Sequence, residues 1–215
     1  MAKFTQAHLE QLNVGLVELG INLSEDSTRK LIQYLELLSK WNKSYNLTAI
    51  TDPEAMVISH LLDSLSIQKY IKGSSIIDVG TGAGLPGIPL AIANPEKIFT
   101  LLDSLGKRTT FLQQVKYELK LYNVNVVDSR AEDYRPDIGY DQVITRAFSS
   151  LGSMLQATKH LGADTTQFLA MKGANYTEEL EEIPDTYTIV SIYSLSVPGL
   201  DAKRHLIILE GSHSG

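Results

Sequence analysis

The apolar residues of the first 70 positions recur at intervals of three and four, which is the spacing of one helix face. The residues concerned are Leu9, Leu12, Leu16, Leu19, Leu31, Leu35 and Leu38. Two start signals support this reading. Ser24 is a good helix cap, and Asp52-Pro53-Glu54 combines a cap with proline at the first helical position. This part of the chain is therefore predicted to be helical.

After Gly73 the pattern changes to short apolar runs separated by helix-compatible segments. The runs are Ser75–Val79, Ile98–Leu102, Val124–Val127, Gln142–Thr145, Gln167–Met171, Ile189–Leu195 and Leu206–Leu209. Alternation of this kind is typical of a parallel sheet covered on both faces. Only residues 196–205 separate the last two runs, too few for a crossover helix, so these runs should form an antiparallel pair at one edge.

The predicted fold is therefore α/β, with a seven-stranded, mostly parallel sheet, one reversed strand and helices on both faces. We divide the chain into an N-terminal helical extension, residues 1–72, and a sheet domain, residues 73–215. A chain of 215 residues with 43% hydrophobic and 20% charged residues buries a core of ordinary size.

Composition narrows the chemistry. The absence of cysteine excludes disulfides, thiolate metal sites and a cysteine nucleophile, and we expect no metal. No run is long and apolar enough for a membrane span, so we expect a soluble, cytoplasmic protein. We also expect it to be a monomer. The net charge of −6 argues against coating nucleic acid by bulk charge. Five acids between Glu178 and Asp185 contribute most of that charge, and we interpret them as a solvated helix face.

A glycine-rich turn follows the first predicted strand. Asp78 closes this strand, and Gly80, Gly82 and Gly84 follow at alternate positions. A phosphate-binding P-loop would need Gly-Lys-Ser/Thr, which is absent, and the dinucleotide pattern that starts at Gly82 lies late after the strand. An acidic residue followed by alternating glycines better fits S-adenosylmethionine, with Asp78 facing its cationic amino acid part.

Asp103 ends the second predicted strand, where a carboxylate can bind both ribose hydroxyls of a nucleoside. Ligands of open parallel sheets lie at the carboxyl ends of the strands. Seven of the 19 lysines and arginines are expected at that edge, which points to a polyanionic substrate. They are Lys107, Arg108, Arg130, Arg146, Lys172, Lys203 and Arg204.

Several segments together resemble the bacterial RsmG (GidB) family. The most specific are DVGTGAGLPG from Asp78 and LLDSLGKR from Leu101; others are NKSYNLT from Asn42, LLDSL from Leu61, Ser129-Arg130-Ala131-Glu132, Arg146-Ala147-Phe148, Lys172-Gly173 and Arg204-His205-Leu206. The resemblance implies a Rossmann-like class I methyltransferase that transfers a methyl group from S-adenosylmethionine to N7 of a guanine in 16S ribosomal RNA, within the 30S subunit or its precursor. One departure is Ser59-His60, where the family often has Arg-His.

Carried over by matching position, the resemblance implies two sets of site residues. The cofactor contacts would be Gly80, Leu85, Asp103, Ala131, Glu132 and Arg146, beside Asp78 and Gly82 of the glycine turn. The RNA contacts would be Lys107, Arg108, Lys172, Arg204 and His205. Arg146 is the candidate catalytic residue, and it would orient either the base or the methionine carboxylate. His60 would be either an RNA ligand or a packed residue.

The implied chemistry needs no general base, because guanine N7 carries a lone pair and no proton. Catalysis then depends on alignment of the reactants, and a nearby carboxylate or carbonyl would stabilise the positive charge that passes to the purine. Two other functions stay open from sequence. One is an NAD- or flavin-dependent oxidoreductase, and the other is a non-catalytic ribosome-assembly factor with a vestigial methyltransferase fold.

Overall fold

The computed structural model describes residues 4–146 and 148–211. Ala147, which belongs to one of the segments of the resemblance, lies outside the described residues. The helices are α1 (Gln6–Glu18), α2 (Glu25–Tyr45), α3 (Pro53–Met56), the π-helix η1 (Val57–Leu62), α4 (Asp63–Leu65), α5 (Gly87–Ala93), α6 (Gly106–Glu118) and α7 (Leu151–Thr158), with short 3₁₀ turns η2 (Gln68–Tyr70), η3 (Lys159–Leu161) and η4 (Glu178–Glu182).

The strands form one sheet in the order β3-β2-β1-β4-β5-β7-β6. They are β1 (Ser75–Val79), β2 (Ile98–Asp103), β3 (Val124–Asp128), β4 (Tyr140–Thr145), β5 (Gly162–Lys172), β6 (Tyr187–Leu195) and β7 (Arg204–Gly211). Strands β1 to β5 pair in parallel, and β7 is antiparallel to both β5 and β6. The prediction of one reversed strand and an antiparallel pair at one edge is confirmed.

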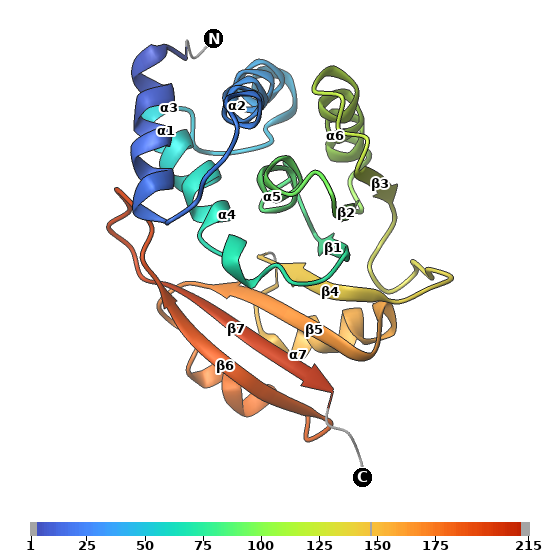
Figure 1. The fold of residues 1–215 in the computed structure, drawn as a ribbon. Coiled ribbons are helices and arrows are strands. Elements are labelled where there is room, and N and C mark those ends of the chain that lie inside the picture. Colours follow the sequence, from blue (N-terminus) through green and yellow to red (C-terminus); the bar gives the residue numbers. More distant parts are fainter. Residues whose placement is uncertain (1–3, 147, 212–215) are drawn as a thin grey trace.

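Helices cover both faces of the sheet, as predicted. Figure 1 shows α2, α5 and α6 on one side and α7 on the other. Two buried apolar clusters correspond to these layers. One joins the N-terminal helices to α5, α6 and one sheet face, and the other joins α7 to the opposite face through residues such as Val143 and Leu155.

The start of the helical region follows the local signals of the sequence. The Ser24 side chain accepts a hydrogen bond from the Ser27 amide (3.1 Å), and the Asp52 side chain accepts one from the Ala55 amide (2.9 Å). Each bond satisfies an amide that the first helical turn leaves unpaired. The helix starts predicted at these two residues are confirmed.

The helical extension reaches the glycine turn of the sheet. Tyr34 of α2 is fully buried, and its hydroxyl donates a hydrogen bond to the carbonyl oxygen of Ala83 (2.9 Å). Residues 1–72 thus contribute to one core with the sheet, and the division of the chain at residue 72 stays a prediction. No helix among the described residues is long and apolar enough to cross a membrane.

Candidate active site

The glycine turn connects β1 to α5 at the carboxyl edge of the sheet. Gly82 and Gly84 have φ angles of +61° and +96°, which L side chains rarely adopt. A Cβ on Gly84 would also lie 2.5 Å from Ile88 and 2.8 Å from Leu112. These positions therefore need glycine for the path of the backbone itself.

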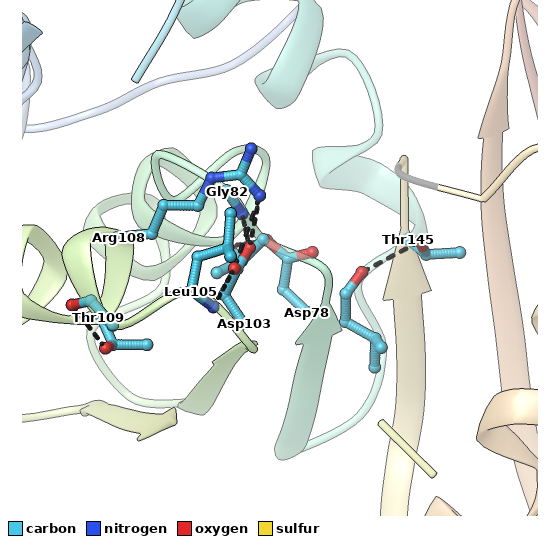
Figure 2. A network of polar contacts seen from close by, with 10 residues as sticks. Asp78, Gly82, Asp103, Leu105, Arg108, Thr109 and Thr145 are labelled. Atoms are coloured by element: carbon cyan, nitrogen blue, oxygen red, sulfur yellow. Dashed lines mark hydrogen bonds and ion pairs between the residues drawn. The ribbon is translucent and has the colours of Figure 1, made fainter. Parts of the chain in front are cut away.

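Asp103 fixes the turn to the neighbouring strand. Its carboxylate accepts hydrogen bonds from the amides of Gly82 (2.9 Å) and Leu105 (3.0 Å), and Arg108 Nη1 lies 3.1 Å from Oδ2 (Figure 2). The side chain is almost fully buried at the end of β2. The carboxylate predicted to bind ribose thus lies beside the glycine turn, held by two amides and one guanidinium.

Asp78 lies deeper, beneath the same turn. Its Oδ2 accepts hydrogen bonds from the Thr81 hydroxyl (2.6 Å) and the Gly87 amide (2.8 Å), whereas its Oδ1 is buried without a hydrogen-bond partner among the described residues. Burial raises the pKa of the Asp78 carboxyl to about 6, although the two hydrogen bonds oppose this rise. In this geometry Asp78 supports the loop from below, and direct contact with a cofactor stays a prediction.

A pocket of about 220 Å³ opens between the ends of β1, β2 and β3. We call it the cofactor pocket, after the predicted cofactor contacts among its lining residues. Its lining comprises Val79, Gly80, Leu102, Asp103, Ser104, Arg108, Ser129, Arg130, Ala131, Glu132 and Phe148. Four predicted cofactor residues therefore meet here: Gly80, Asp103, Ala131 and Glu132. Leu85 is instead buried in the core.

A second pocket of about 440 Å³ adjoins the first, because Phe148 lines both. We call it the charged pocket. Its lining comprises Ile50, Ser59, His60, Asp63, Arg146, Phe148, Ser149, Met171, Lys172, Gly173, Glu179 and Arg204. Three of the predicted cations, Arg146, Lys172 and Arg204, thus meet in one concavity beside the cofactor pocket.

Asp63 is the centre of the charged pocket. Its Oδ2 lies 3.0 Å from Nη1 of Arg146, and its Oδ1 lies 3.1 Å from Nε of Arg204. The carboxylate is almost fully buried, and the π-helix η1 (Val57–Leu62) ends immediately before it. Because π-helical turns are rare and often occur at functional sites, this turn is a local signature of the pocket. One carboxylate fixes two guanidinium groups, one directly after β4 and one at the start of β7.

Lys172 and Glu179 form a second ion pair on the wall of the charged pocket. Lys172 Nζ lies 2.7 Å from Glu179 Oε2 and donates a hydrogen bond to the carbonyl oxygen of Phe148 (3.0 Å). Their side chains are only 10% and 15% exposed. The interpretation of the acidic stretch as a solvated helix face is therefore wrong for Glu179, because this residue turns inward to a buried lysine. The segment is a 3₁₀ helix, and its other glutamates are exposed.

His60 is a packed residue that also lines the charged pocket. Its Nε2 lies 3.0 Å from the Thr48 hydroxyl, and burial lowers its pKa to about 4, with a further contribution from the charge of Arg146. The imidazole is therefore neutral at physiological pH.

The remaining predicted RNA contacts have protein partners in this structure. Lys107 Nζ donates to the carbonyl oxygen of Tyr45 (2.9 Å), and His205 Nδ1 lies 3.0 Å from the carbonyl oxygen of Gly173. Arg108, expected to face RNA, points to Asp103 in the cofactor pocket (Figure 2). Among the described residues, no group of acidic and histidine side chains forms a metal site.

Comparison with known proteins decides the family. A family model described as rRNA small subunit methyltransferase G matches residues 27–207. The chain belongs to this family. A ribosomal RNA small subunit methyltransferase G from Pseudomonas aeruginosa (strain LESB58) is 52% identical over 210 residues, covering 97% of this chain and 98% of that protein. The protein of the same name from Pseudomonas syringae pv. tomato is 51% identical, covering 95% and 97%.

Solved structures agree on the fold. A SAM-dependent methyltransferase from Aquifex aeolicus has a TM-score of 0.56 at 16% identity, covering 80% of this chain and 97% of that one. A SAM-dependent methyltransferase from Thiobacillus denitrificans in complex with S-adenosyl-L-homocysteine has a TM-score of 0.51 at 10% identity, covering 71% and 91%. The Rossmann-like methyltransferase fold is thus confirmed, and the family model and the relatives confirm the recognition of the family.

The sequence of this member of the methyltransferase G family did not lead to a predicted role for three residues of the site, namely Asp63, Phe148 and Glu179. Asp63 stands in LLDSL, one of the segments that carried the resemblance, so a signal for it existed. Phe148 follows Arg146 in another such segment. Glu179 had no signal of its own, because it is one of five neighbouring acids.

Proposed function

We propose that this chain transfers the methyl group of S-adenosylmethionine to N7 of a guanine in 16S ribosomal RNA, within the 30S subunit or its precursor in the cytoplasm, and acts as a monomer. The observation that carries the proposal is the junction of two pockets at Phe148. The cofactor pocket is lined by part of the glycine turn and by a carboxylate, and the charged pocket is lined by three cationic side chains. A nucleoside cofactor and a polyanionic substrate therefore have adjoining places in a chain of the methyltransferase G family.

The residues that line the cofactor pocket offer the groups that S-adenosylmethionine needs. Gly80 lines it without a side chain, and Asp103 brings a carboxylate that can accept hydrogen bonds from ribose hydroxyls. Below the turn, the unpartnered Oδ1 of Asp78 gives the site a buried negative centre on the side of the glycines. When bound, S-adenosylmethionine supplies an electrophilic methyl group with a formal positive charge on sulfur.

The charged pocket would hold the target nucleotide. Arg146 and Arg204, fixed by Asp63, present their remaining N–H groups to phosphate or base, and pre-organised guanidinium groups lose little freedom on binding. Lys107, Arg108, Lys172 and His205 complete the proposed RNA contacts. Phe148 lines both pockets at their junction. Because N7 carries no proton, no side chain has to act as a base.

The test is methyl transfer from isotope-labelled S-adenosylmethionine to 30S subunits, followed by mapping of N7-methylguanine in 16S RNA with and without the protein. A single new N7-methylguanine is the expected result. Absence of transfer to 30S subunits and to their precursors would refute the proposed reaction and favour a non-catalytic assembly factor. Thermal stabilisation by NAD instead of S-adenosylmethionine would favour an oxidoreductase.

A further inference from the structure

Glu179, which pairs with Lys172, is the charged residue of the charged pocket to which the proposed function gives no role. Both carboxylate oxygens of Asp63 are already paired, one with Arg146 and the other with Arg204. Glu179 is the other carboxylate on the pocket wall, and its described ion pair joins Oε2 to Lys172. An ammonium group has three N–H donors, and the described partners of Lys172 are two oxygens, on Glu179 and Phe148. The pair therefore presents an anionic acceptor and a cationic donor side by side.

This arrangement complements one edge of one base. The Watson–Crick edge of guanine carries two adjacent donors, N1–H and the N2 amino group, next to the acceptor O6. Adenine has the opposite polarity at the two corresponding positions, with an acceptor at N1 and a donor amino group at C6. A carboxylate beside an ammonium thus matches guanine and opposes adenine. Both charged side chains are nearly buried, where an unmatched polar group costs most.

We propose that Glu179 and Lys172 read the guanine: the Glu179 carboxylate accepts from N1–H and the N2 amino group, and Lys172 donates to O6. This inference rests on the proposed function, because it assigns the guanine to the charged pocket. A Watson–Crick edge can be read in this way only when the base is unpaired, as in loops and splayed single strands. N7 lies outside this edge and stays free for the reaction.

The same contact would also assist the chemistry. In the step, the N7 lone pair forms a bond to the methyl carbon, the bond from carbon to sulfur breaks with its electron pair on sulfur, and no proton moves. The positive charge passes from sulfur to the purine ring. A carboxylate bonded to N1–H interacts more strongly with the cationic ring than with the neutral one, so Glu179 would stabilise the transition state more than the bound substrate.

The experiment is a competition between two substrates for one enzyme. Once the methylated guanine is mapped, 30S subunits are reconstituted with 16S RNA that carries either guanine or inosine at that position. Inosine keeps N7, O6 and N1–H but lacks the N2 amino group. The wild-type protein should prefer guanine about ten- to a hundredfold in kcat/KM, the usual worth of a hydrogen bond to a charged group. In Glu179→Gln this preference should fall to about threefold or less.

The ratio is measured within each variant, so a smaller folded fraction cancels. Glu178→Gln is the matched control, because Glu178 is the exposed neighbour in the same 3₁₀ helix, and it should keep the wild-type ratio. Glu179→Asp, which retains a carboxylate, should keep part of the preference.

Two outcomes would overturn the inference while leaving the proposed function intact. One is a wild-type protein that methylates guanine and inosine equally well, and the other is a Glu179→Gln variant with an unchanged preference. A wild-type protein that methylates no guanine in native 30S subunits or in their precursors would overturn the proposed function and this inference with it.

Discussion

Replacement of Asp63 by asparagine tests whether one buried carboxylate organises the charged pocket. The change keeps the size of the side chain but removes the charge that faces Arg146 at 3.0 Å and Arg204 at 3.1 Å. One amide oxygen can still accept from one guanidinium, whereas the amide NH₂ would oppose the other. A hydrogen bond to a charged group is worth about 1.5–3 kcal/mol, and breaking a buried pair costs about 3–5 kcal/mol.

The side chains of Arg146 and Arg204 are 31% and 28% exposed, so water screens part of this interaction. We therefore expect Asp63→Asn to lower the free energy of unfolding by about 2–3 kcal/mol, below the full cost of a buried pair. Methyl transfer should fall about tenfold or more, because both arginines lose their fixed position. Affinity for S-adenosylmethionine should change little, since Asp103 and the glycine turn lie in the other pocket.

Urea unfolding, methyl transfer to 30S subunits and calorimetric titration of S-adenosylmethionine measure the three quantities. Asp26→Asn is the matched control: it makes the same chemical change in an exposed pair with Lys30, in the first turn of α2. It should cost less than about 1 kcal/mol of stability and leave methyl transfer and cofactor affinity unaltered. An Asp63→Asn protein with the stability and the methyl transfer of this control would refute the role of Asp63.

Three further predictions concern single side chains. Asp103→Ala should weaken S-adenosylmethionine binding about ten- to a hundredfold, measured by calorimetry, because it removes the carboxylate placed for the ribose hydroxyls. Arg204→Ala should weaken 30S binding and lower the slope of log affinity against log salt by about 0.7–0.9, whereas Arg146→Ala should reduce methyl transfer more than RNA affinity. Burial raises the pKa of Asp78 to about 6 in the folded state. Between pH 4 and 6 the native protein therefore binds more protons than the unfolded chain. The free energy of unfolding then falls as the pH rises through this window. Asp78→Asn should therefore gain stability relative to the wild type from pH 4 to pH 7, measured by urea unfolding.

Each of these has a result that would contradict it. Unchanged affinity for S-adenosylmethionine in a folded Asp103→Ala protein would remove this carboxylate from the site. An Arg204→Ala protein with the wild-type affinity and salt slope would mean that the RNA docks elsewhere. A stability difference between Asp78→Asn and the wild type that does not vary with pH would mean that the carboxyl titrates normally.

The fold could be predicted from the sequence because its signals are local. Apolar runs, caps and glycines report on neighbouring residues, and the alternation of strands and helices then limits the topology. The largest error in strand length is at β5 (Gly162–Lys172), predicted only from Gln167. Its first half, GADTT, is polar and mostly exposed, so it carries no apolar pattern.

The charged pocket was harder to predict because its contacts join distant parts of the chain. Asp63 contacts Arg146, which is 83 positions further along the chain, and Arg204, which is 141 positions further along. Nothing in the local pattern of LLDSL specifies those partners. Similarly, five neighbouring acids look alike in sequence, and only the path of the chain after β5 turns Glu179 towards Lys172. Strand ends indicated which cations share an edge, but not which of them are paired with a carboxylate.

The hydrogen bond from Tyr34 to Ala83 has a consequence for the design of chimeras between such an enzyme and other proteins. Because a buried hydroxyl from α2 satisfies a carbonyl of the glycine turn, the helices before the sheet take part in shaping the loop itself. A chimera that grafts this sheet onto a foreign substrate-recruiting module, without α2, would leave that carbonyl unsatisfied and expose the apolar face of α5. The transferable unit is therefore the helices together with the sheet, and new specificity is better engineered in the loops at the strand ends than by exchange of the N-terminal segment.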